Sequence, residues 1–207
     1  MGELTPLPLS FYRRPADEVA RDLIGRWVVR RLDGRRSVLR IVETEAYLGE
    51  IDRASHAWGG RRTERTAALY RDGGRAYVYL VYGMHHLLNA VTGERCDGTA
   101  VLLRAGEAIE GAAIMARRRG LASALRPGQL AGGPAKLTQA LAVDLALNGA
   151  SLRQGELTVT AGRPVEPGAV ATGARIGVDY AGDHASWPLR FAEAGNPEVS
   201  RPWPWRG

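Results

Sequence analysis

Hydrophobic and polar residues alternate along several short stretches of this chain, and a period of two is typical of β-strands. Two turns, Asp33-Gly34 and the one at Gly83, each separate a pair of such stretches and therefore predict two hairpins. The alternating or apolar stretches indicate strands at residues 27–32, 37–47, 75–81, 85–91, 99–105, 157–160, 172–178 and 187–191.

A second group of segments carries helix signals. Asp17 and Glu18 lie in the first turn of one segment, where the helix dipole favours acids, and Pro134 starts another. Helices are expected at residues 16–23, 63–70, 107–119 and 134–141. Because strands and helices are mixed along 207 residues without a repeat or a linker, we expect one α+β domain.

The remaining segments are expected to be irregular. Residues 48–75 are rich in turn residues and predict loops, and residues 7–12 are expected to be extended. Residues 1–8 and 200–207 are predicted to be extended or disordered tails of a single domain that comprises residues 1–207.

The charge balance is basic, with 28 lysines and arginines against 22 acids and a formal net charge of +6. This excess favours a polyanionic partner, and general solubility is the alternative interpretation. Cys96 is the single cysteine, which excludes an internal disulfide and fits a reducing compartment. Without a signal-peptide pattern or an apolar run of membrane-spanning length, we expect a cytoplasmic monomer, at the nucleoid in a bacterium.

Acidic and phenolic side chains share one face of the strand predicted at 37–47. Side chains alternate along a strand, so Glu43, Glu45 and Tyr47 point to one side and Thr44 to the other. Two carboxylates beside a phenol fit proton chemistry, and an exposed polar strand face is the alternative. Spacing alone does not choose between the two carboxylates.

The second predicted hairpin is rich in tyrosine. Tyr77 and Tyr79 share one face of its first strand, where Tyr77 is a candidate core residue. Tyr82 falls beside the turn, where a core cannot easily hold it, and is a candidate probe into a partner. Arginines that either contact phosphates or form a solvated surface are Arg53, Arg61, Arg62, Arg65, Arg71 and Arg75.

Signatures of metal sites and of catalytic nucleophiles are missing. None of the four histidines has a zinc-binding spacing, and no nucleophile elbow occurs. Gly132-Gly-Pro-Ala-Lys136 lacks the ending and the preceding strand of a phosphate loop. We therefore expect neither a metal nor a cofactor.

Several motifs follow one another in an order and spacing that together are specific. They are Arg40-Ile-Val-Glu-Thr-Glu-Ala-Tyr-Leu-Gly49, His56, Tyr77-Val-Tyr-Leu-Val-Tyr-Gly-Met84, Asn89, Val101-Leu-Leu-Arg104, Gly133-Pro-Ala-Lys-Leu137, Arg175-Ile-Gly-Val178 and Pro188-Leu-Arg-Phe191. From Leu9 to Ser200 the chain closely resembles the alkyladenine DNA glycosylases, also called 3-methyladenine DNA glycosylases. The resemblance implies a single mixed domain with a curved antiparallel sheet, surrounding helices and a protruding β-hairpin.

The resemblance also implies roles for individual residues. Glu45 is expected to be the general base that activates water, with Arg104 and the carbonyl of Ile176 as its partners in holding that water. The base pocket is expected between Tyr47 on one side and His56 with Tyr79 on the other. The remaining expected roles are a gate beside the purine for Asn89, entry into the duplex for Tyr82, and a place beside it for Met84.

The expected partner is double-stranded DNA that contains damaged purines. The resemblance implies that 3-methyladenine and 7-methylguanine, with hypoxanthine and ethenoadenine as further candidates, are flipped out and excised by hydrolysis. An abasic site would remain, without backbone cleavage. The alternatives are a non-catalytic module that binds damaged nucleic acid and, less favoured, an RNA-processing protein, because charge does not distinguish RNA from DNA.

Overall fold

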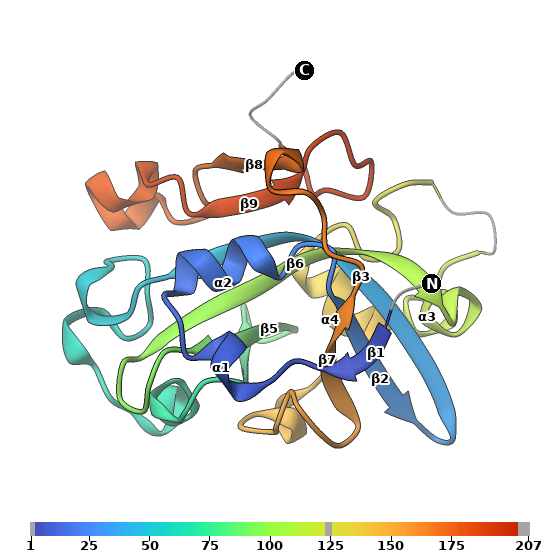
Figure 1. Ribbon diagram of the computed structural model, residues 1–207, viewed down its shortest axis with the longest axis horizontal. Coiled ribbons are helices and arrows are strands. Elements are labelled where there is room, and N and C mark those ends of the chain that lie inside the picture. Colours follow the sequence, from blue (N-terminus) through green and yellow to red (C-terminus); the bar gives the residue numbers. More distant parts are fainter. Residues whose placement is uncertain (1–2, 123–125, 203–207) are drawn as a thin grey trace.

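The protein, described from a computed structural model, is built on one large sheet (Figure 1). The structure describes residues 3–122 and 126–202, and within them nine strands form the sheet, all paired antiparallel. The strands are β1 (Glu3–Pro6), β2 (Trp27–Leu32), β3 (Arg35–Tyr47), β4 (Ala76–Val81), β5 (His85–Thr92), β6 (Thr99–Glu110), β7 (Leu157–Gly162), β8 (Val170–Gly173) and β9 (Arg190–Glu193). The predicted α+β class, with its curved antiparallel sheet, is confirmed.

Short helices surround the sheet. Helix α2 packs against β3 and β6, and α4 packs against β5 and β6. In the described residues the α-helices are α1 (Leu9–Tyr12), α2 (Ala16–Asp22), α3 (Ala112–Arg118) and α4 (Pro134–Leu141). The 3-10 segments are Gly49–Ile51, Trp58–Gly60, Glu64–Tyr70, Leu145–Leu147, Pro167–Ala169 and Asp179–Ser186. None of the helices in this part of the chain is long and apolar enough to cross a membrane.

The long strand β3 organises the sheet. The strands follow the order β1-β7-β2-β3-β6-β5-β4, and β9 pairs with residues 43–45 of β3, with β8 beyond it. The register of β3 against β6 shifts between Ile41 and Glu43 and again before Thr44. Such irregularities bend a strand, so the sheet curves beside the predicted carboxylates.

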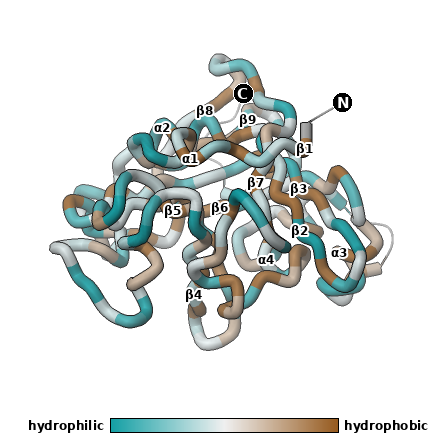
Figure 2. The backbone as a smooth tube through the Cα atoms, turned by 60° about the horizontal axis from the view of Figure 1, so that its bottom comes forward, coloured by the Kyte–Doolittle hydropathy of each residue, from teal (hydrophilic) through white to brown (hydrophobic). Residues whose placement is uncertain are grey.

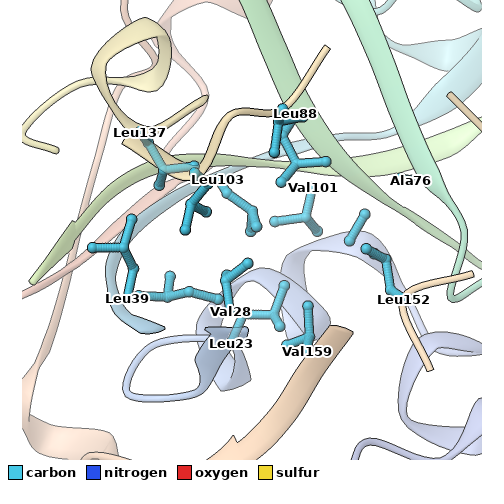
Figure 3. Close-up of a cluster of buried hydrophobic side chains, with 14 of the residues drawn as sticks. Leu23, Val28, Leu39, Ala76, Leu88, Val101, Leu103, Leu137, Leu152 and Val159 are labelled. Atoms are coloured by element: carbon cyan, nitrogen blue, oxygen red, sulfur yellow. The ribbon is translucent and has the colours of Figure 1, made fainter. Parts of the chain in front are cut away.

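The main core lies on one face of the sheet (Figure 3). Leu39 from β3 and Val101 and Leu103 from β6 meet Leu23, next to α2, and Leu137 of α4. All five side chains are at most 1% exposed. Burial of side chains of this size stabilises the fold by roughly 1.5–3 kcal/mol each. Figure 2 shows hydrophobic stretches of the chain near β3, β7 and α4.

The opposite face of β3, β6, β5 and β4 carries a different set of side chains. Tyr77, Val91 and Ala100 point there and pack with Leu69 in a smaller cluster, so Tyr77 is a core residue in part. The same alternation sends Asn89, Tyr79, Arg104 and Glu45 to this face. We call it the site face, because it holds every strand residue for which a pocket or catalytic role is expected.

The helix predicted at 107–119 begins later than expected. Strand β6 continues to Glu110, and α3 starts at Ala112 after Gly111, whose φ of 78° ends the strand. Glu110 accepts hydrogen bonds of 2.8–3.0 Å from Arg36, which lies on the neighbouring strand β3. Cross-strand pairing of this kind outweighs the helix preference of the acidic stretch.

Both ends of the chain contact the sheet in the part that the structure describes. Within the segment expected to be extended at residues 7–12, residues 9–12 instead form α1, because Tyr12 enters the core and is fully buried. Residues 3–6 are extended as β1, paired with β7. Ser200 is buried, and residues 203–207 of the predicted tail lie outside the described residues.

Two local expectations are also revised. The strand predicted at 172–178 ends at Gly173, because Arg175 turns inward to a buried ion pair with Asp52. Thr63 caps the next turn as predicted by accepting a hydrogen bond from Thr66 N, but the segment that it begins is a 3-10 helix.

Candidate active site

One row of side chains crosses four strands of the site face. Tyr77 of β4 pairs with Asn89 of β5, Asn89 pairs with Leu102 of β6, and Leu102 pairs with Glu45 of β3. Residues that pair across antiparallel strands lie side by side on the same face. Strand register therefore places a carboxylate, an amide and a phenol within reach of one space.

That space is a cavity of about 500 Å³ over the site face. Residues from the segments 54–69 and 176–180 also line it. The residues predicted from the sequence that line it are Tyr47, His56, Tyr79, Tyr82, Asn89, Arg104 and Ile176. Lining residues that were not predicted to form a pocket include Ser55, Arg65, Leu102 and Tyr180. A cavity of this size with a few polar groups is typical of a small-molecule or base site.

Glu45 lies behind the cavity wall and is fully buried, so the alternative of an exposed polar face is wrong. Its Oε1 accepts a hydrogen bond of 2.8 Å from Ile176 N and lies 3.2 Å from Arg104 Nη1. Its Oε2 accepts a hydrogen bond of 3.0 Å from the Tyr47 hydroxyl. The three partners all line the cavity, so the carboxylate lies against the cavity wall that they form. Ile176 contacts Glu45 through its N–H, whereas the sequence resemblance implies a role for its carbonyl.

Arg104 carries a full positive charge in this setting. Burial, the largest single influence, lowers its pKa, but Glu45 and Glu43 together raise it above the ordinary value. Arg104 Nε also donates to Glu43 Oε1 at 3.1 Å, so one guanidinium joins both carboxylates.

A buried ion pair supports the Tyr47 wall. Arg175 and Asp52 side chains are fully buried, with Nη2 and Oδ1 2.9 Å apart. Arg175 also lies 4.9 Å from the centre of the Tyr47 ring, in a cation–π contact. Burial and then Glu45 raise the pKa of Tyr47, so its hydroxyl keeps its proton and donates to the carboxylate. Because Ile176 follows Arg175, this pair also fixes the loop that reaches Glu45.

The opposite wall is a cluster of three rings. The centroids of His56 and Tyr79 lie 4.6 Å apart, and His56 Nδ1 lies 2.8 Å from the Tyr77 hydroxyl. Burial, then Arg65 and Arg61, lower the pKa of His56, so the ring is neutral near pH 7. Burial raises the pKa of Tyr77 to about 12, so this hydroxyl also stays protonated. His56 and Tyr79 thus lie in contact along the cavity, and their role as a wall against a bound base stays a prediction.

Asn89 sits on the floor of the cavity. It is 3% exposed, and its amide nitrogen donates to the Tyr77 carbonyl at 3.1 Å. That bond fixes the orientation of the side chain, which suits the predicted gate beside a bound base.

The hairpin of β4 and β5 ends in an exposed aromatic tip. Tyr82 is 88% exposed and lines the rim of the cavity. Met84, two residues further on, is 68% exposed. Tyr82 and Gly83 have φ of 52° and 69°, and Met84 N donates to Val81 O at 3.2 Å. Positive φ is costly for a tyrosine, so the tip carries both strain and exposed apolar surface, a combination found at functional sites.

A second, basic cavity of about 370 Å³ adjoins the first and shares His56, Ser55, Arg65 and Tyr180 with it. The predicted arginines fall into two groups. Arg53, Arg61 and Arg65 line this cavity, whereas Arg62 and Arg71 line another one, beside Cys96.

Tyr180 was not predicted from the sequence to be a cavity residue. The sign that could have revealed it is the position of an aromatic residue just after the Arg175-Ile-Gly-Val178 motif. Among the described residues, no group of three or more His, Cys, Asp or Glu is placed to hold a metal ion.

Fold and site together define a class of protein, one with a cavity between aromatic side chains, beside a buried carboxylate and a projecting tyrosine. Comparison with known proteins agrees with that class. Residues 10–197 match the model of the methylpurine-DNA glycosylase family. The chain is similar to the human DNA-3-methyladenine glycosylase, with 43% identity over 96% of this chain and 69% of the human one.

Microbial relatives are similar over almost their whole length. Proteins provisionally named 3-methyladenine DNA glycosylases share 48% identity in Methanocella arvoryzae, over 94% of this chain and 96% of that one, and 46% in Myxococcus xanthus, over 94% and 93%. The chain belongs to the methylpurine-DNA glycosylase family. The expected class, a DNA glycosylase of DNA repair, is confirmed by this membership.

Proposed function

We propose that this chain is a monofunctional glycosylase that flips alkylated or deaminated purines out of duplex DNA and hydrolyses the N-glycosidic bond. The candidate substrates are 3-methyladenine and 7-methylguanine, with hypoxanthine and ethenoadenine as further members. The observation that carries the proposal is the Glu45 carboxylate, held at the wall of the aromatic cavity by Arg104, Tyr47 and Ile176 N. A binding module has no need of a fully buried carboxylate, which is costly to desolvate.

The aromatic walls supply the binding energy. Extruding a base from a duplex costs a few kcal/mol. Stacking on aromatic rings returns roughly 1–3 kcal/mol per base, here between Tyr47 and the rings of His56 and Tyr79. A purine alkylated at N3 or N7 is cationic and gains roughly 0.5–2 kcal/mol more from the ring faces.

The reaction itself needs one base and one water. Water attacks the sugar C1′, the C1′–N bond breaks, and the purine leaves with the bonding electrons. Glu45 takes the proton from water and its negative charge stabilises the cationic sugar as it forms. Arg104 lines the cavity beside Glu45 and is placed to orient the water. No amine nucleophile takes part, so an abasic site remains and the DNA backbone stays intact.

The experiment is single-turnover excision on a panel of duplexes that each contain one lesion. The wild-type chain should release free base and leave sites that break only with alkali. Glu45→Gln keeps the shape and removes the base, so excision should fall by roughly 10²- to 10⁴-fold while lesion binding persists. Glu110→Gln, a change in an acid at the far end of β6, is the matched control and should excise normally.

The outcomes separate the candidate functions. A non-catalytic binding module would bind the lesion duplexes without releasing base. Unchanged excision by Glu45→Gln would remove Glu45 from the mechanism, and strand breaks without alkali would contradict the monofunctional assignment. The monomeric state and the cytoplasmic or nucleoid location remain predictions that accompany this proposal.

A further inference from the structure

Glu43 is the second carboxylate on the site face, and every polar atom of its side chain is held by hydrogen bonds. It is fully buried, and its two oxygens accept hydrogen bonds from three segments of the chain, namely β6, β9 and the segment at Ser200. The bonds come from Arg104 Nε at 3.1 Å, Arg190 Nε at 2.6 Å, Ser200 N at 2.8 Å and Ser200 Oγ at 2.9 Å. A buried carboxylate is tolerated only with such pairing, so these partners stabilise its charge.

The Arg104 guanidinium is held at three points. Nε donates to Glu43 at 3.1 Å, Nη1 lies 3.2 Å from Glu45, and Nη2 donates to Ser200 Oγ at 3.4 Å. A planar guanidinium held on three of its atoms has little freedom to rotate. The geometry of Arg104 at Glu45 therefore depends on groups that do not reach the cavity.

Arg190 connects this arrangement to the C-terminal segment. Its Nη1 donates to Pro202 O at 2.8 Å and its Nη2 to Ser200 O at 2.9 Å, while Nε holds Glu43. Arg190 lies on β9, whose backbone pairs with β3 at Glu45. Residues 200–202 are thereby fastened directly behind the carboxylates.

We propose that Glu43, Arg190 and Ser200 form a positioning cluster that fixes Arg104 against Glu45, which makes the C-terminal segment a working part of the active site. The inference rests on the proposed function. Counted together with the pair that it positions, the cluster is balanced in charge. The carboxylates of Glu43 and Glu45 face the guanidinium groups of Arg104 and Arg190. Without the charge of Glu43, the Nε atoms of Arg104 and Arg190 would lose their carboxylate partner, and the Arg104 guanidinium would be free to turn away from Glu45.

The test compares Glu43→Gln with Thr44→Val in single-turnover excision at saturating enzyme, well below the melting temperature. Thr44 lies next to Glu43 but points to the core, where its hydroxyl donates to Ala20 O at 2.8 Å. Thr44→Val therefore removes a buried hydrogen bond outside the positioning cluster and controls for lost stability. Affinity for lesion duplex and the melting temperature are measured on each variant.

Glu43→Gln should lose up to about 10²-fold in the excision rate with lesion affinity unchanged, since small misplacements of catalytic groups cost that much. Thr44→Val should melt lower and excise at the wild-type rate. A merely structural role for Glu43 predicts lower melting with an unchanged rate, and that result would overturn the inference.

Ser200→Ala serves if Glu43→Gln does not fold. It removes one neutral hydroxyl that contacts Glu43 and Arg104, so excision should fall about threefold to tenfold, the size of one hydrogen bond. Wild-type excision by this variant would also overturn the inference. A wild-type chain that releases no base from any lesion would overturn the proposed function itself, and the inference with it.

Discussion

Replacement of Tyr82 by alanine tests the hairpin tip, because the change should separate DNA binding from folding. The ring is 88% exposed and therefore makes little contact with the rest of the protein. The positive φ of 52° at this position remains in the alanine variant, so backbone strain does not change either. The free energy of unfolding should stay within about 0.5 kcal/mol of the wild type.

The effect on DNA should be much larger. A tyrosine that fills the gap left by an extruded nucleotide replaces a lost base stack, which is worth roughly 1–3 kcal/mol. Loss of the ring should therefore shift the flipping equilibrium by roughly 5- to 150-fold toward the stacked base. The loss should shrink at a poorly stacked lesion, where less unstacking is needed.

The assay follows the fluorescence of ethenoadenine in a duplex, which reports the flipping equilibrium directly. Tyr82→Phe keeps the ring without the hydroxyl and is the matched control, which should flip the base as the wild type does. Tyr79→Ala removes a cavity wall and should weaken recognition in every sequence context.

Two results would refute the reasoning about Tyr82. One is normal flipping by Tyr82→Ala, which would mean that the ring does not enter the duplex. The other is a drop in melting temperature of several degrees, since 0.5 kcal/mol corresponds to only about 1–2 °C in a domain of this size. Such a drop would show that the ring stabilises the fold.

Three further predictions concern charge. Asp52→Ala leaves the Arg175 guanidinium buried without its partner and should destabilise the fold by about 3–5 kcal/mol, measured by denaturant unfolding; a loss below 1 kcal/mol would contradict the burial argument. The pKa of His56 is lower in the folded protein than in the unfolded chain, so on acidification the unfolded chain binds a proton on this ring before the folded protein does. Acidification below about pH 6.5 should therefore destabilise the wild type more than His56→Gln, and equal pH dependence of melting would exclude a neutral His56. Log affinity for DNA should fall linearly with log salt, by about 0.9 per phosphate contacted, and Arg61→Ala should reduce the slope by about that amount if Arg61 reaches a phosphate.

Alternation and turn residues were enough to place most of the sheet. The hairpin around Gly83 and the strands beside it form as predicted, because Tyr82 and Gly83 adopt the positive φ that such a turn requires. The same alternation correctly put Glu43, Glu45 and Tyr47 on one face. These features depend on residues that are close in sequence, and local patterns describe them well.

Burial at the site could not be read from the same pattern. Two acids on a strand face suggest exposure, yet Glu43 and Glu45 are fully buried. Glu43 is covered by Arg104, Arg190 and Ser200, which lie from 61 to 157 residues away in sequence. A strand pattern carries no information about partners at that distance, so it gave no sign that Glu43 would hold Arg104 and Arg190. Tyr180 was missed for a similar reason, because it reaches the cavity only through the folded path of the loop that carries it.

The strand register makes the core and the site depend on one another. Asn89 faces the cavity while Leu88 and Ala90 on either side of it are in the core, and Leu102 alternates with its neighbours in the same way. A slip of one residue between β5 and β6 would bury the Asn89 amide in the main core and expose leucine in the cavity. An unpaired buried amide costs about 1–3 kcal/mol, and the displaced leucine adds to that loss. The fold is therefore stable only in the register that also aligns Asn89 with Glu45, and so the packing of the core selects the arrangement that the chemistry needs.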